Sequence, residues 1–442
     1  MAGSAAWAQA VPGDTAKPER DPRLEWAGPL NVMHRTLAEP LRAVRKEPSS
    51  GPKQLARIVA RGPDAIAPLY DILVEERIPR VHADDPAQLL SEPQCQLLLS
   101  ALAKFPVERV RAELEQRLAL PPSAGDVPQR VAALRVLSVI GNSKDLARLS
   151  GIAPREREEL GPKAAEALRG AYAAILRREP ALLARRRELL KSCDASAAKQ
   201  LLFAAGDLGD KRALALLGDC ARSVPALAQQ AVALVPRVGA SGDAELDQGF
   251  AAWLAERLDP ERLEWTRASL RAIGVLDDGS QVPALLEALE SPHAGLREAG
   301  LGALQQLSGL RLGSELEAWR EWYARETEWR STGRQAALQA LASDDTAQVA
   351  QALGKYAERR LFRDELAQDV LQVLEHGSLP MRAMACGTLT RIGSQVALSP
   401  LIEHFSDEED AVAEAAWRAA CALTGQALPR TTDEARALLG NS

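Results

Sequence analysis

The sequence predicts an all-α protein in which helix pairs are stacked one on the next. Apolar residues recur with helical spacing from about Lys53 to the end of the chain, and short polar breaks interrupt them. The chain also matches itself at a fixed offset. Its apolar content, 46%, comes mainly from Ala, Leu and Val, with only 4% aromatic residues. Such small side chains suit closely packed helices.

The first 52 residues precede this pattern and are predicted to be a flexible lead. Residues 1–10 read MAGSAAWAQA, and Ala8-Gln9-Ala10 has the small-x-small form of a signal-peptidase site. A basic segment and an apolar segment, which a signal peptide also needs, are missing from this stretch. If residues 1–10 are the end of a longer signal peptide, we expect a periplasmic or exported protein. If they are an Ala-rich tail, we expect a cytoplasmic one.

Residues 53–442 are expected to form the helical body. Apolar residues recur at i, i+3, i+4 and i+7 in VAALRVLSVI (131–140) and in VPALLEALE (282–290). Segments that carry Gly, Pro, Asp or Ser separate such runs, and no run alternates with the period of two that a strand requires. These breaks are GNSKD (141–145), GDLGDK (206–211), LDDGSQ (276–281) and SDEEDA (406–411).

An internal repeat supports helix pairs as the building unit. Shifted by 116 residues, 284–323 pairs with 400–439 without a gap. Identical residues include Leu285 with Leu401 and Gly309 with Gly425. An offset of 116 equals three units of about 38 to 39 residues, a period typical of two-helix repeats.

The segments 270–304 and 389–425 resemble HEAT repeats. Each has a helix ending in Ile-Gly, a polar turn, a helix containing Pro and Leu, and a second long helix. LSGLRLGSELEAWREWY (307–323) looks like the closing unit of bacterial HEAT proteins of the phycobilisome-lyase type. The resemblance is clear over 200–442 and weaker over 53–199. It implies a right-handed α–α superhelix, a HEAT-like or armadillo-like solenoid, of about ten helix pairs.

Residues 253–330 form an aromatic-rich middle block, followed by a C-terminal block at 331–442. On a helical wheel, Leu316, Trp319, Trp322, Tyr323 and Trp329 share one arc of about 140°, as a core-facing stripe does. The repeat pairs Trp319 with Ala435, so apolar character persists where aromaticity does not. The cluster is therefore predicted to be structural, while the position of Trp329 stays unassigned.

No residue pattern for catalysis, cofactor binding or metal binding emerges, so no site residue is predicted. Nucleophile-elbow, phosphate-loop and dinucleotide-binding glycine patterns do not occur. None of the five histidines precedes a Glu, whereas HEAT-like deoxyhypusine hydroxylase binds its iron through His-Glu pairs. The reversed pairs Glu375-His376 and Glu403-His404 are expected to be ordinary helix positions. The five cysteines, which are dispersed, form no disulfide or zinc pattern.

Charge argues against nucleic acid as a partner. The net charge is −6, and the one basic cluster, at 177–191, is interrupted by Glu179 and Glu188. The acidic turns at Asp277-Asp278 and Asp407–Asp410 lack the ligand spacing of a calcium loop and are expected to cap helices. No apolar run reaches the length of a membrane span.

Two function classes follow. The favoured one is a non-catalytic scaffold that binds a protein or peptide on the concave face of a solenoid. The alternative is a HEAT-like enzyme of the bilin-lyase or alkylpurine-DNA-glycosylase type. The pattern identifies neither the partner nor the oligomeric state.

Overall fold

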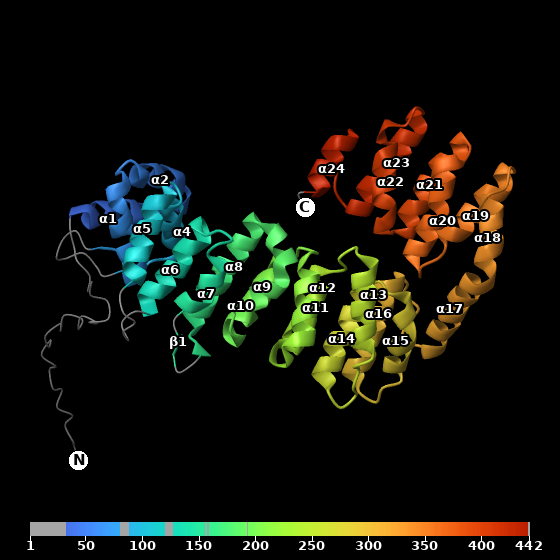
Figure 1. The fold of residues 1–442 in the computed structure, drawn as a ribbon, viewed down its shortest axis with the longest axis horizontal. Helices are drawn as coiled ribbons and strands as arrows, with labels where there is room; N and C mark the ends of the chain where they lie inside the picture. The colour runs from blue at the N-terminus through green and yellow to red at the C-terminus, as the bar shows by residue number, and fades with distance from the viewer. Residues whose placement is uncertain are drawn as a thin grey trace, which may run out of the picture. The chain divides into compact units, whose positions relative to one another are not determined.

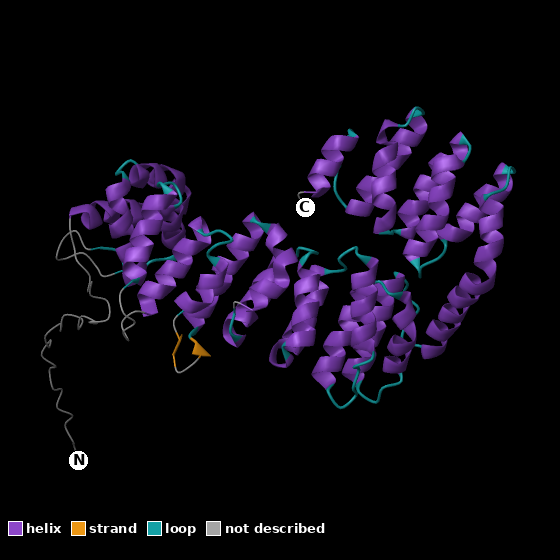
Figure 2. Cartoon of the chain, in the orientation of Figure 1, coloured by secondary structure: helices purple, strands orange, loops and turns teal. Residues whose placement is uncertain are grey.

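The computed structural model describes residues 32–79, 88–119, 127–153, 155–156, 159–191 and 193–440. Across these residues the protein is all-α, as predicted (Figure 2). The exceptions are the short antiparallel strands β1 (Arg155–Glu156) and β2 (Glu159–Leu160) and one isolated bridge between Arg77 and Leu89. The predicted signal-peptide end at residues 1–10 lies outside the described residues.

The chain divides into two compact units, Met1–Ile175 and Leu176–Ser442. The boundary falls inside one helix, α8. The helices that begin in the first unit are α1 (Val32–Lys46), α2 (Gly51–Val59), α3 (Ile66–Glu75), α4 (Glu92–Leu102), α5 (Val107–Leu118), α6 (Val127–Ile140), α7 (Leu146–Ile152) and α8 (Pro162–Arg178).

Helix α1 lies within the predicted lead of residues 1–52. Its residues Leu37, Leu41 and Val44 follow the i, i+4, i+7 spacing of an amphipathic helix and are buried. They pack where α1 meets α2, α3 and α4. The side chain of Gln94 on α4 also donates a hydrogen bond of 2.7 Å to the carbonyl of Leu41. Residues 32–46 are thus part of the first unit's core, which begins ahead of residue 53.

In the second unit, helices pack mainly on a neighbour one or two places along the chain. Examples are the pairs α14 with α16, α19 with α21, and α21 with α23. The helices are α9 (Arg186–Lys191), α10 (Ala195–Leu208), α11 (Ala213–Ser223), α12 (Ala228–Val238), α13 (Ala244–Ala255), α14 (Leu263–Val275), α15 (Val282–Leu289), α16 (Ala294–Ser308), α17 (Leu316–Glu328), α18 (Arg334–Leu341), α19 (Thr346–Ala357), α20 (Arg363–His376), α21 (Leu379–Ile392), α22 (Leu398–Glu403), α23 (Asp410–Thr424) and α24 (Thr432–Gly440).

The internal repeat has the same register in the structure. We call residues 276–324 the first copy and residues 392–440 the second copy. At an offset of 116, helix α15 begins where α22 begins, α16 begins and ends where α23 does, and α17 begins where α24 begins. Gly309 and Gly425, which follow α16 and α23, both have a left-handed φ of 69°. The gapless sequence match therefore reflects two copies of one three-helix arrangement.

A π-helical turn, Trp329–Gly333, joins α17 to α18. A Cβ atom on Gly333 would lie 2.7 Å from Cδ1 of Trp329, so this close approach requires glycine. Beyond the turn, α18–α24 form a row of helices that lies opposite α11–α16 within the second unit (Figure 1). Turns that are far apart in the sequence consequently face one another.

Candidate functional site

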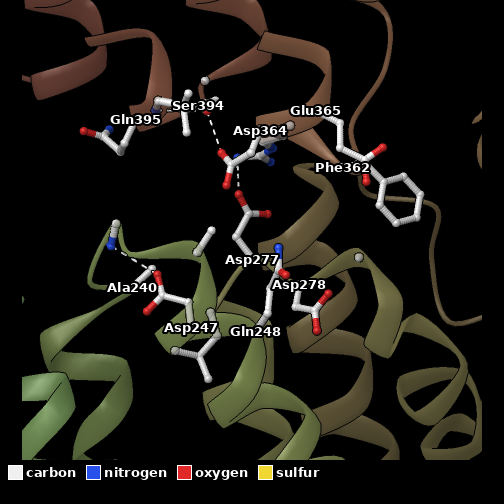
Figure 3. Close-up of a pocket in the computed structure, with 17 residues that line it drawn as sticks. Ala240, Asp247, Gln248, Asp277, Asp278, Phe362, Asp364, Glu365, Ser394 and Gln395 are labelled. Atoms are coloured by element: carbon white, nitrogen blue, oxygen red, sulfur yellow. Dashed lines mark hydrogen bonds and ion pairs between the residues drawn. The ribbon is translucent and has the colours of Figure 1, made fainter. Parts of the chain in front are cut away.

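Four segments of the second unit converge on a cavity of about 110 Å³, which we call the aspartate recess (Figure 3). Its walls are the turn before α13 with the start of that helix, the turn between α14 and α15, the start of α20, and the turn between α21 and α22. The second and fourth of these turns, Leu276–Gly279 and Gly393–Val396, nearly coincide in the repeat register. Equivalent turns of the two copies thus face one another across the recess.

Asp277 differs from its counterpart in a way that costs stability. It has a left-handed backbone with φ of 54°, and its counterpart Gly393 has φ of 78°. A side chain in this conformation is strained, whereas glycine is not. Phe362, across the recess, is also left-handed with φ of 57°. Two of the three non-glycine residues with positive φ in the described chain therefore line this one cavity.

The turn of Asp277 is held tightly on both sides. The carboxylate of Asp278 accepts hydrogen bonds from the Ser280 backbone N–H at 3.0 Å and from the Ser280 hydroxyl at 2.7 Å, which confirms a capping role. Ser394, its counterpart, caps in the same way by accepting from the N–H of Val396 at 3.1 Å. A Cβ atom on Gly279 would lie 3.3 Å from atoms of Leu361 and Phe362, so the turn packs closely on the segment before α20.

The carboxylate of Asp277 points toward the start of α20 (Figure 3). Its Oδ2 lies 3.5 Å from Nη1 of Arg363, and 39% of the Asp277 side chain stays exposed. Enclosure by the cavity walls raises its pKa to about 6; Arg363 opposes the shift, and Asp364 and Asp278 add to it. Asp277 is thus a partly accessible carboxylate whose pKa is raised above the ordinary value of an aspartate.

Two further carboxylates of the recess, those of Asp247 and Asp364, are fixed by internal hydrogen bonds. Asp247 accepts from the backbone N–H groups of Ser241 and Gly242 at 3.0 and 3.1 Å, and burial raises its pKa. Asp364 accepts from the hydroxyl of Ser394 at 2.6 Å. Hydrogen bonds of this kind leave the negative charges of Asp247 and Asp364 in place, whereas Glu365 pairs with Arg330 and Arg334. Among the described residues that line the cavity, Arg363 is the only cation.

A second, wider recess of about 610 Å³ adjoins the first and shares Gly242 and Gln395 with it. We call it the adjoining recess. Leu398, Leu423 and Leu439 form its apolar wall, and the turn between α10 and α11 forms its opposite side. The aspartate recess has room for one cationic head group, and the adjoining recess has room for the chain that carries it. Among the described residues, no group of three or more His, Cys, Asp or Glu side chains is arranged to bind a metal ion.

The two histidines considered from the sequence lie elsewhere. His376 is exposed at the end of α20, with its Nε2 3.6 Å from the Glu375 carboxylate. His404 lies near the end of α22, with its Nδ1 2.9 Å from Asp407, which also pairs with Arg382. Asp407 accepts a hydrogen bond from the N–H of Glu409 at 3.1 Å, which orders the turn ahead of α23. It does not cap that helix: Glu409 is the N-cap residue, and no side chain there accepts from the first turn of α23.

The tryptophans of α17 are packed inside the protein. Trp319 is fully buried and Trp322 is 4% exposed, and their rings meet edge-on with centroids 5.6 Å apart. The indole N–H of Trp319 donates to the carbonyl of Gly313 at 2.9 Å. Trp329, which the internal repeat left unassigned, packs edge-on against Tyr356 with ring centroids 5.3 Å apart. The structural interpretation of the cluster therefore agrees with its packing.

Some arginines of the basic cluster at 177–191 form ion pairs with nearby carboxylates. Arg186 lies 2.7 Å from Asp219, and Arg185 lies 2.5 Å from Glu188. None of the described helices combines the length and the apolar character that crossing a bilayer requires.

Sequence reasoning did not identify Asp277 as a site residue, because both aspartates of its turn were interpreted as caps. The signal was nevertheless present: the offset of 116 places Asp277 opposite a glycine. A comparison of the sequence with models of known protein families finds no match, and a search of the curated proteins finds no similar one.

Proposed function

We propose that this protein is a non-catalytic scaffold with a HEAT-like solenoid, which binds a protein partner through a basic peptide segment. The partner's Lys or Arg side chain occupies the aspartate recess, and its flanking residues lie along the adjoining recess. The observation that carries this proposal is Asp277, a strained carboxylate at a position where the second copy has glycine.

Strain at this position argues for a selected role. A left-handed aspartate costs stability that a glycine would recover, and such costs persist mainly at functional sites. Enclosure near other carboxylates adds an electrostatic cost, since it raises the pKa of Asp277 to about 6. A bound ammonium or guanidinium group lowers this electrostatic cost, because its positive charge lies next to the carboxylates of the recess.

The shape of the two recesses favours a peptide over a small cation. An isolated ion gains only the electrostatic interaction in the small cavity. A peptide also buries apolar surface against Leu398, Leu423 and Leu439 in the adjoining recess. The repeat register supports the HEAT-like part of the proposal, since solenoids commonly bind extended segments along rows of equivalent turns.

The cellular compartment of the partner depends on whether residues 1–10 are the end of a signal peptide or an Ala-rich tail. If residues 1–10 end a signal peptide, the partner is an exported or envelope protein; otherwise it belongs to a cytoplasmic complex. Cell fractionation of the native protein separates these cases.

Photocrosslinking tests the proposal in the native cell. A benzoylphenylalanine residue is introduced at Gln395, which lines both recesses, or at the exposed control position Glu287, which lines neither. We expect one prominent crosslinked partner from position 395 only, and we expect its yield to fall when Asp277→Asn is combined with the crosslinker. Equal crosslinking from both positions, or a yield unaffected by Asp277→Asn, would contradict the proposal.

A further inference from the structure

A second recess in the same unit has the opposite charge. It is open, has a volume of about 570 Å³, and is lined by four arginines and two glutamates together with Leu310, Trp322 and Ala357. We call it the arginine recess. The arginines come from three places in the fold: Arg325 from α17, Arg359 and Arg360 from the segment after α19, and Arg391 from the end of α21.

A buried glutamate fixes one wall of this recess. Glu326 is only 6% exposed; its carboxylate lies 3.5 Å from Nη1 of Arg359 and accepts from the backbone N–H of Arg360 at 3.3 Å. The guanidinium of Arg359 also stacks on the ring of Trp329 at 5.2 Å. The segment after α19 is therefore tied to α17, and Arg359 is committed to internal contacts.

Two of the arginines, Arg360 and Arg391, do not use their guanidinium groups in contacts of this kind. Within the part of the chain that the structure describes, the guanidinium groups of Arg360 and Arg391 take part in no ion pair and donate to no acceptor. Arg391 is exposed and Arg360 is partly exposed, so both can reach a ligand. The single charge of Glu326 is already used by Arg359, which leaves the recess with an excess of positive charge.

The chemistry of this surface favours carboxylates on a peptide over phosphates on a nucleic acid. Guanidinium groups bind carboxylates in a two-pronged geometry. Leu310, with the largely buried Trp322 beside it in the lining, supplies a small apolar floor for a side chain between them. Binding a nucleic acid backbone needs a long track of cations. Here Glu358 lies within the recess and Glu321 beside Arg325, 3.9 Å away, so the positive surface is short.

We propose that the arginine recess binds an acidic peptide segment of a protein partner, with its carboxylates on Arg360 and Arg391 and one apolar side chain against Trp322 and Leu310. This site is separate from the aspartate recess and takes a ligand of opposite charge. Its success or failure is thus independent of the basic segment proposed above.

The test uses the full chain and a fluorescein-labelled peptide of sequence EELEE, with binding followed by fluorescence anisotropy. A KKLKK peptide and a single-stranded oligothymidine serve as competing probes. The variants are Arg360→Ala, Arg391→Ala and Arg391→Glu, and Arg271→Ala is the control, because Arg271 is exposed on α14 and lines no part of this recess. Unchanged circular dichroism shows that each variant is folded.

We expect the acidic peptide to bind, and each alanine variant at the recess to weaken binding on the order of tenfold, the loss of one charge-assisted hydrogen bond. Arg391→Glu should weaken binding further, and Arg271→Ala should leave it unchanged. Absence of binding by the wild-type protein, equal loss in the control, or tighter binding of the oligothymidine would each overturn the proposal.

Discussion

The two copies of the internal repeat share their helix boundaries but differ at a few positions that matter. Leu285 and Leu401 are both fully buried, and Ala303 and Ala419 are both 3% exposed. By contrast, the first copy has Trp319 and Trp322 where the second has Ala435 and Leu438. Trp322 is 4% exposed and Leu438 is 40% exposed. The common positions form the repeat unit, and the differing ones adapt each copy to its neighbours.

The most informative difference is Asp277 against Gly393. Both residues follow a helix in the left-handed conformation, and both line the aspartate recess. Only the glycine adopts that conformation without strain. The comparison suggests that the first copy gives up stability to place a carboxylate in the recess, whereas the second does not.

We expect the largest effect on the free energy of unfolding at the position where the first copy has Trp319 and the second has Ala435. Trp319→Ala should lower the free energy of unfolding by about 3–5 kcal/mol, because it leaves a cavity beside Trp322 and removes the bond to Gly313. Trp319→Leu should cost less, since apolar volume is largely kept. The reciprocal Ala435→Trp should cost roughly 1–3 kcal/mol by overpacking. Denaturant titration followed by circular dichroism measures all three. A Trp319→Ala cost below that of Ala435→Trp would contradict this assignment.

The shared glycines should respond alike. Gly309→Ala and Gly425→Ala each place a Cβ atom on a left-handed residue with φ of 69°, in open space. Each change should destabilise the protein by roughly 1–2 kcal/mol, from backbone strain alone. The same titration measures the two costs and their sum in the double variant. Clearly unequal costs would show that the copies differ in more than their side chains.

Replacing Asp277 by glycine and Gly393 by aspartate should change the stability of the protein in opposite directions. Asp277→Gly should raise the free energy of unfolding by roughly 0.5–1 kcal/mol, because relief of left-handed strain exceeds the flexibility that glycine adds to the unfolded chain. Gly393→Asp should lower it by a similar amount. Thermal unfolding of both variants checks the signs. A destabilising Asp277→Gly would mean that the pair with Arg363 outweighs the strain.

A further expected effect is a difference in pH dependence. The pKa of Asp277 is about 6 in the folded protein and 3.8 ordinarily, so from pH 4 to pH 6 the folded state keeps a proton that the unfolded state has lost. Wild-type stability should therefore fall, relative to Asp277→Asn, as the pH rises through this window. Melting temperatures of the two proteins at pH 4, 5, 6 and 7 provide the comparison. A difference that does not change with pH would refute the raised pKa.

Much of the fold could be predicted from the sequence, because helical periodicity and the offset of 116 depend on local patterns. Helix α1 was missed because Pro-rich surroundings concealed its Leu37, Leu41 and Val44 stripe. The aspartate recess could not be predicted, because it forms only when the start of α20 reaches the turn of Asp277. That approach depends on the path of the chain after α17, which the periodic pattern does not encode.

The most direct test of the account measures stability and binding on the same pair of proteins, wild type and Asp277→Gly. A fluorescein-labelled KLLK peptide is titrated at pH 7.5 and at pH 5, and thermal unfolding is recorded alongside. We predict that the wild type binds the peptide more weakly at pH 5, where Asp277 is protonated, and that Asp277→Gly is more stable but binds on the order of tenfold more weakly at pH 7.5. A glycine variant that binds the peptide as tightly as the wild type would contradict the claim that Asp277 is retained for a basic ligand.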